Sequence, residues 1–122
     1  MKKIMLIMVI SLLLVGCSSG VSFISIDRNR AEKLINEENA IVIDVRTLEE
    51  YQSGHIKDSI NIPIDKITIE KLEQVIPSKD NNIIVYCRSG NRSRQTAQIL
   101  IDLGYTNVYD LGGINNWSGE FE

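Results

Sequence analysis

The most informative segment of the sequence is Ile83-Ile84-Val85-Tyr86-Cys87-Arg88-Ser89-Gly90-Asn91-Arg92-Ser93. Its first residues form a continuous apolar and mostly β-branched run, which is typical of a strand buried on both faces of a sheet. A short polar loop follows at once. Beyond the loop, Ala97, Leu100 and Ile101 recur at helical spacing, with Gly104 as the expected C-terminal stop. The stretch therefore predicts a strand, a tight loop and a helix in direct succession.

The rest of the chain repeats this alternation of strands and helices. Helices are expected after Asp27 and after Thr47, which are both good N-cap residues, and around Leu72 just before Pro77. The further strand candidates are Ile41-Val42-Ile43, Phe23-Ile24-Ser25-Ile26, Ser59-Ile60-Asn61-Ile62 and Asn107-Val108-Tyr109. Strands that alternate with helices predict an α/β domain, with a mostly parallel sheet covered by helices on both faces.

The loop places a thiol where parallel sheets bind ligands. Cys87 is expected at the carboxyl end of its strand, just before the positive end of a helix. A tight loop there directs successive backbone N–H groups inward, and Gly90 adopts backbone angles closed to other residues. These amides, together with the guanidinium groups of Arg88 and Arg92, would stabilise a thiolate and any anion attached to it. The pattern therefore indicates a nucleophilic cysteine.

Composition narrows the class of protein. The chain has 122 residues, enough for one domain, and its formal net charge is −3. An acidic chain is a poor candidate for binding nucleic acid. Cys17 and Cys87 are its only cysteines and are assigned unrelated roles, so no disulfide framework is expected. Cys87 and the single histidine, His55, are too few ligands for a metal site, and no cofactor is expected.

The first residues of the chain have the pattern of an export signal. Met1-Lys2-Lys3 is a basic start, and the apolar run from Ile4 to Val15 is too short to span a bilayer. Gly16 and Cys17 follow this run, and the pattern resembles the bacterial lipoprotein signal. The resemblance implies cleavage after Gly16 and attachment of lipid, including palmitate, to Cys17.

This interpretation divides the chain into three parts. Residues 1–16 are the expected lipoprotein signal peptide, residues 17–22 the lipidated cysteine and a tether, and residues 23–122 the folded domain. Several acyl chains on one cysteine are sufficient for stable anchoring. We therefore expect the domain outside the cytoplasm, held at the surface of a bacterial membrane through Cys17.

Several patches of sequence, in order along the chain, resemble the rhodanese family of sulfurtransferases. The patches are Asp44-Val45-Arg46, Tyr51, Gly54-His55-Ile56, Ser59-Ile60-Asn61-Ile62-Pro63, the loop at Cys87, and Leu111-Gly112-Gly113-Ile114 with Trp117. The resemblance covers about Ile24 to Trp117. It implies a single rhodanese-like domain with a largely parallel five-stranded sheet flanked by helices on both faces.

The resemblance also implies a reaction. In rhodaneses the loop cysteine takes the outer sulfur of a donor, becomes a persulfide, and passes that sulfur to a second nucleophile. Carried over, Cys87 is the nucleophile, with Asp44 and Arg46 as supporting residues. The residues implied to cradle the persulfide are Arg88, Ser89, Gly90, Asn91, Arg92 and Ser93. The implied donor is thiosulfate or a similar anion, and the implied acceptor is cyanide, a small thiol or a protein thiol.

Loop length and charge separate this reaction from its relatives. Cys87 and Arg92 form a Cys-x4-Arg loop, the short loop of the sulfur-transferring members, whereas related phosphatases and arsenate reductases have one more residue. The basic loop favours thiosulfate over mercaptopyruvate, whose enzymes have a nearly uncharged loop. Three alternatives stay open. One is a sulfur-carrying or anion-binding sensor module without significant turnover, and another is a thiol redox relay in which Cys87 forms mixed disulfides. The third is a thiol phosphatase or arsenate reductase, which the short loop disfavours.

Overall fold

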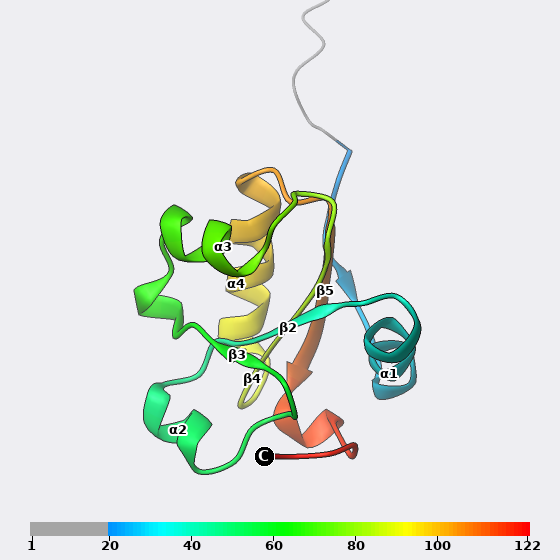
Figure 1. Ribbon diagram of the computed structural model, residues 1–122, viewed down its shortest axis with the longest axis vertical. Helices are drawn as coiled ribbons and strands as arrows, with labels where there is room; N and C mark the ends of the chain where they lie inside the picture. Colours follow the sequence, from blue (N-terminus) through cyan, green and yellow to red (C-terminus); the bar gives the residue numbers. More distant parts are fainter. Residues whose placement is uncertain (1–19) are drawn as a thin grey trace, which may run out of the picture.

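The computed structural model describes residues 20–122, so the expected signal peptide and Cys17 lie outside the described residues. In the described part, strands and helices alternate as predicted (Figure 1). The strands are β1 (Ile24–Ser25), β2 (Ile41–Asp44), β3 (Ile60–Asn61), β4 (Asn82–Cys87) and β5 (Asn107–Gly113). The helices are α1 (Arg28–Glu37), α2 (Leu48–Gln52), α3 (Ile69–Val75) and α4 (Asn91–Asp102), with 3-10 turns η1 (Ile64–Lys66) and η2 (Ile114–Asn116).

The five strands form one sheet in the order β1-β5-β4-β2-β3, and every neighbouring pair is parallel. The register places Asp44 beside Tyr86 and Cys87 beside Gly113. The carboxyl ends of β2, β4 and β5 therefore meet at one edge, which is where parallel α/β sheets bind ligands. The predicted α/β fold with a parallel five-stranded sheet is confirmed.

Helices cover both faces of the sheet and enclose two cores. In Figure 1, α3 and α4 lie on one side and α1 lies on the other. Leu72 and Leu100 pack over the first face, while Ala31 and Leu34 pack over the second. Successive strand residues point to opposite faces, so Ile83, Val85 and Cys87 belong to the first core and Ile84 and Tyr86 to the second. The thiol consequently faces α4.

Local signals in the sequence fix where the helices begin and end. The carboxylate of Asp27 accepts a hydrogen bond from the backbone N–H of Arg30 at 2.9 Å, and Thr47 forms a capping box with Glu50. Gly104, just beyond α4, has φ +97°, a left-handed conformation that favours glycine. The predicted caps and the predicted stop are therefore confirmed.

Strand β5 is longer than the sequence pattern indicates. It continues through Gly112 and Gly113, which local propensity places in a turn. Pairing with β4 continues because the register shifts between Val85 and Tyr86, which leaves Leu111 as an extra residue on β5. This bulge carries the end of β5 alongside Cys87 and brings two glycines to the sheet edge.

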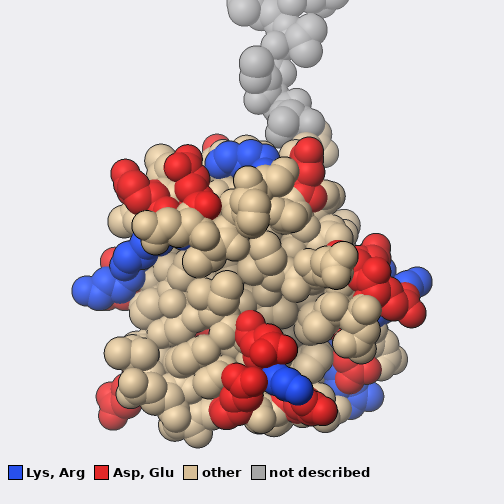
Figure 2. All heavy atoms as spheres, viewed as in Figure 1, with Lys and Arg blue, Asp and Glu red and all other residues tan. Residues whose placement is uncertain are grey.

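Charged side chains are unevenly distributed over the face of the domain drawn in Figure 2. On the face seen in Figure 2, Asp, Glu, Lys and Arg side chains lie around the edge, and uncharged residues occupy most of the centre. None of the helices within residues 20–122 is long and apolar enough to cross a membrane.

Substitution of Leu100 by alanine tests the core beneath the thiol. Leu100 is fully buried, whereas its neighbour Ile99 is 37% exposed. Leu100→Ala should lower the free energy of unfolding by about 2–5 kcal/mol, because it removes buried methyl groups and leaves a cavity. Ile99→Ala should cost less than about 1 kcal/mol. Urea unfolding measures both, and equal losses would contradict this placement of the α4 face.

Candidate active site

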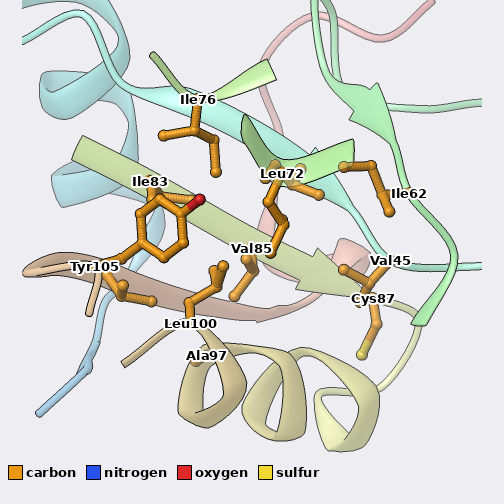
Figure 3. Close-up of a cluster of buried hydrophobic side chains, with 12 residues drawn as sticks. Val45, Ile62, Leu72, Ile76, Ile83, Val85, Cys87, Ala97, Leu100 and Tyr105 are labelled. Atoms are coloured by element: carbon orange, nitrogen blue, oxygen red, sulfur yellow. The ribbon is translucent and has the colours of Figure 1, made fainter. Parts of the chain in front are cut away.

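Cys87 lies at the base of the loop between β4 and α4. It is the last residue of β4 and only 1% exposed. Its Sγ accepts a hydrogen bond from the backbone N–H of Gly90 at 2.9 Å. In Figure 3 the sulfur points toward the N-terminal end of α4. The thiol therefore sits where backbone amides and the positive end of a helix converge.

The loop turns directly into α4 through Gly90. This residue is the N-cap and has φ +101°, which is left-handed and favours glycine. Its carbonyl accepts hydrogen bonds from the Ser93 hydroxyl at 3.1 Å and from the Arg94 N–H at 3.2 Å. Ser93 is fully buried. These contacts hold the Gly90 carbonyl toward the helix, while the Gly90 N–H on the preceding peptide points to Cys87.

The first turn of α4 differs from those of the other helices. Asp27, Thr47 and Thr68 cap α1, α2 and α3 through their side chains, but α4 has no side-chain cap hydrogen bond. The first N–H groups of a helix have no partner within the helix itself. The amides at the start of α4 are therefore available to an anion bound beside Cys87.

Strand β5 packs closely against one side of the loop. A Cβ on Gly113 would lie 2.7 Å from the carbonyl oxygen of Arg88, and a Cβ on Gly90 would lie 3.6 Å from the Cα of Gly112. The first distance is shorter than real Cβ contacts. Glycine at position 113 thus allows the loop to lie directly against β5.

Asp44 and Arg46 belong to a buried network behind the loop. The Asp44 carboxylate accepts hydrogen bonds from Arg46 Nη2 and from the Tyr86 hydroxyl, both at 2.7 Å. Tyr86 also accepts from the Ile56 N–H at 3.1 Å, and Arg46 donates to the Gly54 carbonyl at 2.7 Å. Burial, reinforced by the hydrogen bond to Asp44, raises the pKa of Tyr86 well above its ordinary value, so its hydroxyl remains protonated.

This network lies on the opposite face of the sheet from Cys87. Tyr86 precedes Cys87 and packs in the α1 core, whereas Cys87 packs in the α4 core. Fixing Tyr86 on one face orients the next side chain toward the other. Asp44 and Arg46 therefore contact each other, and Asp44 also contacts Tyr86 near the end of β4.

The two loop arginines have different environments. The Arg92 guanidinium makes a bidentate ion pair with Glu50 of α2, at 2.7 and 3.0 Å. This contact holds the pKa of Glu50 at about 2, because hydrogen bonds from Arg92 favour the carboxylate. Arg88 is exposed and, within residues 20–122, has no carboxylate within ion-pair distance. Arg88 is thus the loop cation that remains open to a ligand.

Sequence reasoning did not identify Glu50 as part of the site. Its sequence signal is the capping box that begins at Thr47, and this pattern indicates only the start of a helix. The partner of Glu50 is 42 residues further along the chain. Only the packing of α2 beside α4 brings the two side chains together.

A hollow of about 420 Å³ lies at the same edge of the sheet. Its lining residues are Arg46, Glu50, Ser53, Arg88, Ile114 and Asn115. Three of them follow closely on the carboxyl ends of β2, β4 and β5. The hollow offers room for a small anion beside Arg88, although Cys87 itself is not among its lining residues.

His55 is bound into the turn after α2. Its ring stacks on Tyr51 with 3.7 Å between centroids, and its Nδ1 lies 2.9 Å from the Tyr51 carbonyl. Its Nε2 lies 3.3 Å from the Glu122 carboxylate. Through these contacts the imidazole connects the turn after α2 to the C-terminal segment. Among residues 20–122, no three His, Cys, Asp or Glu side chains gather as metal ligands.

Comparison with known proteins identifies the class that this fold and site define. The rhodanese-like domain family matches residues 27–120, so the chain belongs to that family. The thiosulfate sulfurtransferase PspE of Escherichia coli is 39% identical over 74 residues, which are 61% of this chain and 70% of that protein. A sulfurtransferase of Allochromatium vinosum is 38% identical over 89 residues, covering 72% and 80% of the two chains.

Solved structures show the same likeness. A structure described as a rhodanese with anions from E. coli is 35% identical and superimposes with a TM-score of 0.64. The match covers 68% of this chain and 96% of that one. Family membership and these relatives support sulfurtransferase activity in broad terms.

Gly113→Ala tests the contact between β5 and the loop. Gly113 has φ −79° and ψ 146°, a conformation open to alanine, so the substitution acts mainly through the clash with the Arg88 carbonyl. We expect the loop to be displaced and the rate of Cys87 alkylation by iodoacetamide to change several-fold. Asn115→Ala, at the rim of the hollow, is the control. Unchanged alkylation of a folded Gly113→Ala protein would show that β5 does not hold the loop.

Proposed function

We propose that this protein is a sulfurtransferase that moves a sulfane sulfur from thiosulfate, or a similar anionic donor, through a persulfide on Cys87. One observation carries the proposal. The thiol accepts a hydrogen bond from Gly90 and faces a helix whose first turn has no side-chain cap. A persulfide anion placed there would receive the backbone amides that α4 leaves unpartnered.

The geometry of the loop supports the following first half-reaction. The Cys87 thiolate attacks the outer sulfur of thiosulfate, the S–S bond of the donor breaks, and sulfite leaves with the bonding electron pair. The amides at the start of α4 receive the negative charge of the new persulfide. Arg88, the open cation of the loop, attracts the donor and stabilises the departing sulfite.

The second half-reaction returns the enzyme to its starting state. An acceptor nucleophile, cyanide or a thiolate, attacks the outer sulfur of the persulfide, and the Cys87 thiolate leaves. Each half-reaction starts from the form of Cys87 that the other half-reaction produces, so the kinetics should be ping-pong. Arg92 contributes its backbone N–H to the cradle while Glu50 holds its guanidinium. Asp44 and Arg46 support the end of β4 from the opposite face.

Two features support particular substrates. The relative from E. coli is named a thiosulfate sulfurtransferase, which favours thiosulfate as the donor. The hollow beside Arg88 opens at the surface and is larger than thiosulfate requires. An open site of this kind admits thiols as acceptors, including a thiol on another protein.

An intact-mass measurement tests the proposal directly. The full chain carrying Cys17→Ser, which leaves Cys87 as its single thiol, is exposed to thiosulfate. We expect the mass of one added sulfur atom, lost again on adding cyanide and absent when Cys87→Ser is also present. No gain from a protein whose Cys87 still reacts with iodoacetamide would exclude thiosulfate as donor. Mixed disulfides trapped without any donor would favour the redox relay, and a stable persulfide without turnover would favour the sensor module.

We also propose that the chain is an exported lipoprotein anchored through Cys17. The support is the sequence pattern alone, a basic start and an apolar run that ends in Gly16-Cys17. Expression in bacteria fed radiolabelled palmitate should label the wild-type protein and place it in the membrane fraction. Cys17→Ser should remove the label, while Cys87→Ser should keep it. Label in Cys17→Ser, or none in wild type, would exclude this anchor.

A further inference from the structure

The side chain of Glu50 is held between two elements. Its carboxylate accepts hydrogen bonds from the backbone N–H and the hydroxyl of Thr47, at 3.2 and 3.1 Å, within the capping box of α2. The same carboxylate binds both terminal nitrogens of Arg92 on α4. Glu50 is half-buried and lines the hollow beside the loop. It therefore joins the start of α2, beside the hollow, to the first turn of α4.

The arginines of the site differ in whether a carboxylate neutralises them. Asp44 neutralises Arg46 at 2.7 Å, and Glu50 neutralises Arg92 at 2.7 Å. Arg88 has no carboxylate within ion-pair distance in the described part of the chain. Of the three guanidinium groups of Arg46, Arg88 and Arg92, only that of Arg88 is therefore left uncompensated for an approaching anion.

We propose that Glu50 is a positioning residue that sets the charge selectivity of the donor site. By holding and neutralising Arg92, it keeps the site from binding dianionic donors much more strongly than monoanionic ones. The site then accepts sulfane donors with one negative charge, such as organic thiosulfonates, as well as dianionic thiosulfate. This inference rests on the proposed sulfur transfer and assigns a role to a residue outside the Cys87 loop.

Two donors isolate the effect of charge from the effect of chemistry. Thiosulfate is a dianion, and methanethiosulfonate is a monoanion with the same reacting sulfur. In both cases the Cys87 thiolate attacks the outer sulfur and the S–S bond breaks, so that sulfite leaves from one donor and methanesulfinate from the other. The ratio of kcat/KM for thiosulfate to kcat/KM for methanethiosulfonate, with cyanide as acceptor, therefore reports how the site responds to the second charge.

Glu50→Gln is the central variant. Glutamine retains an oxygen for the capping box and for Arg92, but it removes the charge that compensates the guanidinium. The kcat/KM ratio should rise about three- to tenfold at low ionic strength, since an extra charge on the donor would meet an uncompensated cation. The rise should shrink as salt is added, because salt screens interactions of partly exposed charges.

Glu49→Gln is the matched control. Glu49 lies in the same first turn of α2, is exposed, and forms no ion pair within residues 20–122. Removing its charge changes the net charge of the protein by the same amount without releasing Arg92. The kcat/KM ratio should change less than about twofold, as expected for a distant and screened charge. A rise equal to that of Glu50→Gln would show a general charge effect and overturn the proposal.

Arg92→Gln and the double variant test the sign of the effect. Arg92→Gln leaves the Glu50 carboxylate uncompensated, so the ratio should fall below that of wild type. Glu50→Gln combined with Arg92→Gln restores the original charge balance and should return the ratio close to the wild-type value. The proposal is overturned if both single variants shift the ratio in the same direction. If Glu50→Gln does not fold, the comparison of Arg92→Gln with the double variant decides, because these two proteins differ only in the charge of Glu50: equal ratios would overturn the proposal.

The two proposals fail in distinguishable ways. If wild type gains no sulfur from either donor, the sulfur transfer itself is excluded and the role of Glu50 falls with it. If wild type turns over both donors but Glu50→Gln leaves their ratio unchanged, only the selectivity role is excluded. In that case Glu50 acts solely as a structural link between α2 and α4.

Discussion

The rest of the site depends on the hydrogen bond from the Gly90 N–H to the sulfur of Cys87. This contact requires a loop that reverses direction within three residues after a buried strand. The left-handed backbone of Gly90 provides the reversal, and the Ser93 hydroxyl donates a hydrogen bond to the Gly90 carbonyl. As a result the chain places a thiol, a turn of unpartnered amides and the positive end of α4 around one point. No other helix in residues 20–122 begins in this way, because α1, α2 and α3 are capped by their own side chains.

The sheet makes this loop rigid by supporting it from both faces. Alternation along β4 directs Tyr86 into one core and Cys87 into the other, so the two side chains are fixed independently. Tyr86 is bound to Asp44, which also holds Arg46, and the network extends to the turn that contains Ile56. On the side of the loop, Gly113 allows β5 to approach the Arg88 carbonyl. A buried polar network of this kind is stable only when every member has a partner, and within the described residues none lacks one.

The net charge that this site presents depends more on which arginines are paired with carboxylates than on how many basic residues it contains. Arg46 and Arg92 each bind a carboxylate, whereas Arg88 stays exposed. A cation held by a bidentate carboxylate has lost most of its attraction for a third group, but it retains a fixed position. Arg92 thus links α2 to the helix whose first amides have no side-chain cap, while Arg88 stays exposed. In the sulfur transfer that we propose, Arg92 would hold the loop in place and Arg88 would attract the donor.

We could predict from the amino-acid sequence the layered fold, the position of Cys87 at the end of a buried strand, and most helix starts. These features depend on local properties, namely β-branched runs, capping side chains such as Asp27 and Thr47, and the angles that glycine permits. The sequence did not predict which arginines are paired with carboxylates or how far β5 extends, because both depend on long-range packing. Glu50 meets Arg92 across 42 positions, and Gly113 meets the loop through a bulge in a neighbouring strand. Such contacts depend on the packing of distant segments, and a single sequence carries no local signal for the distance between them.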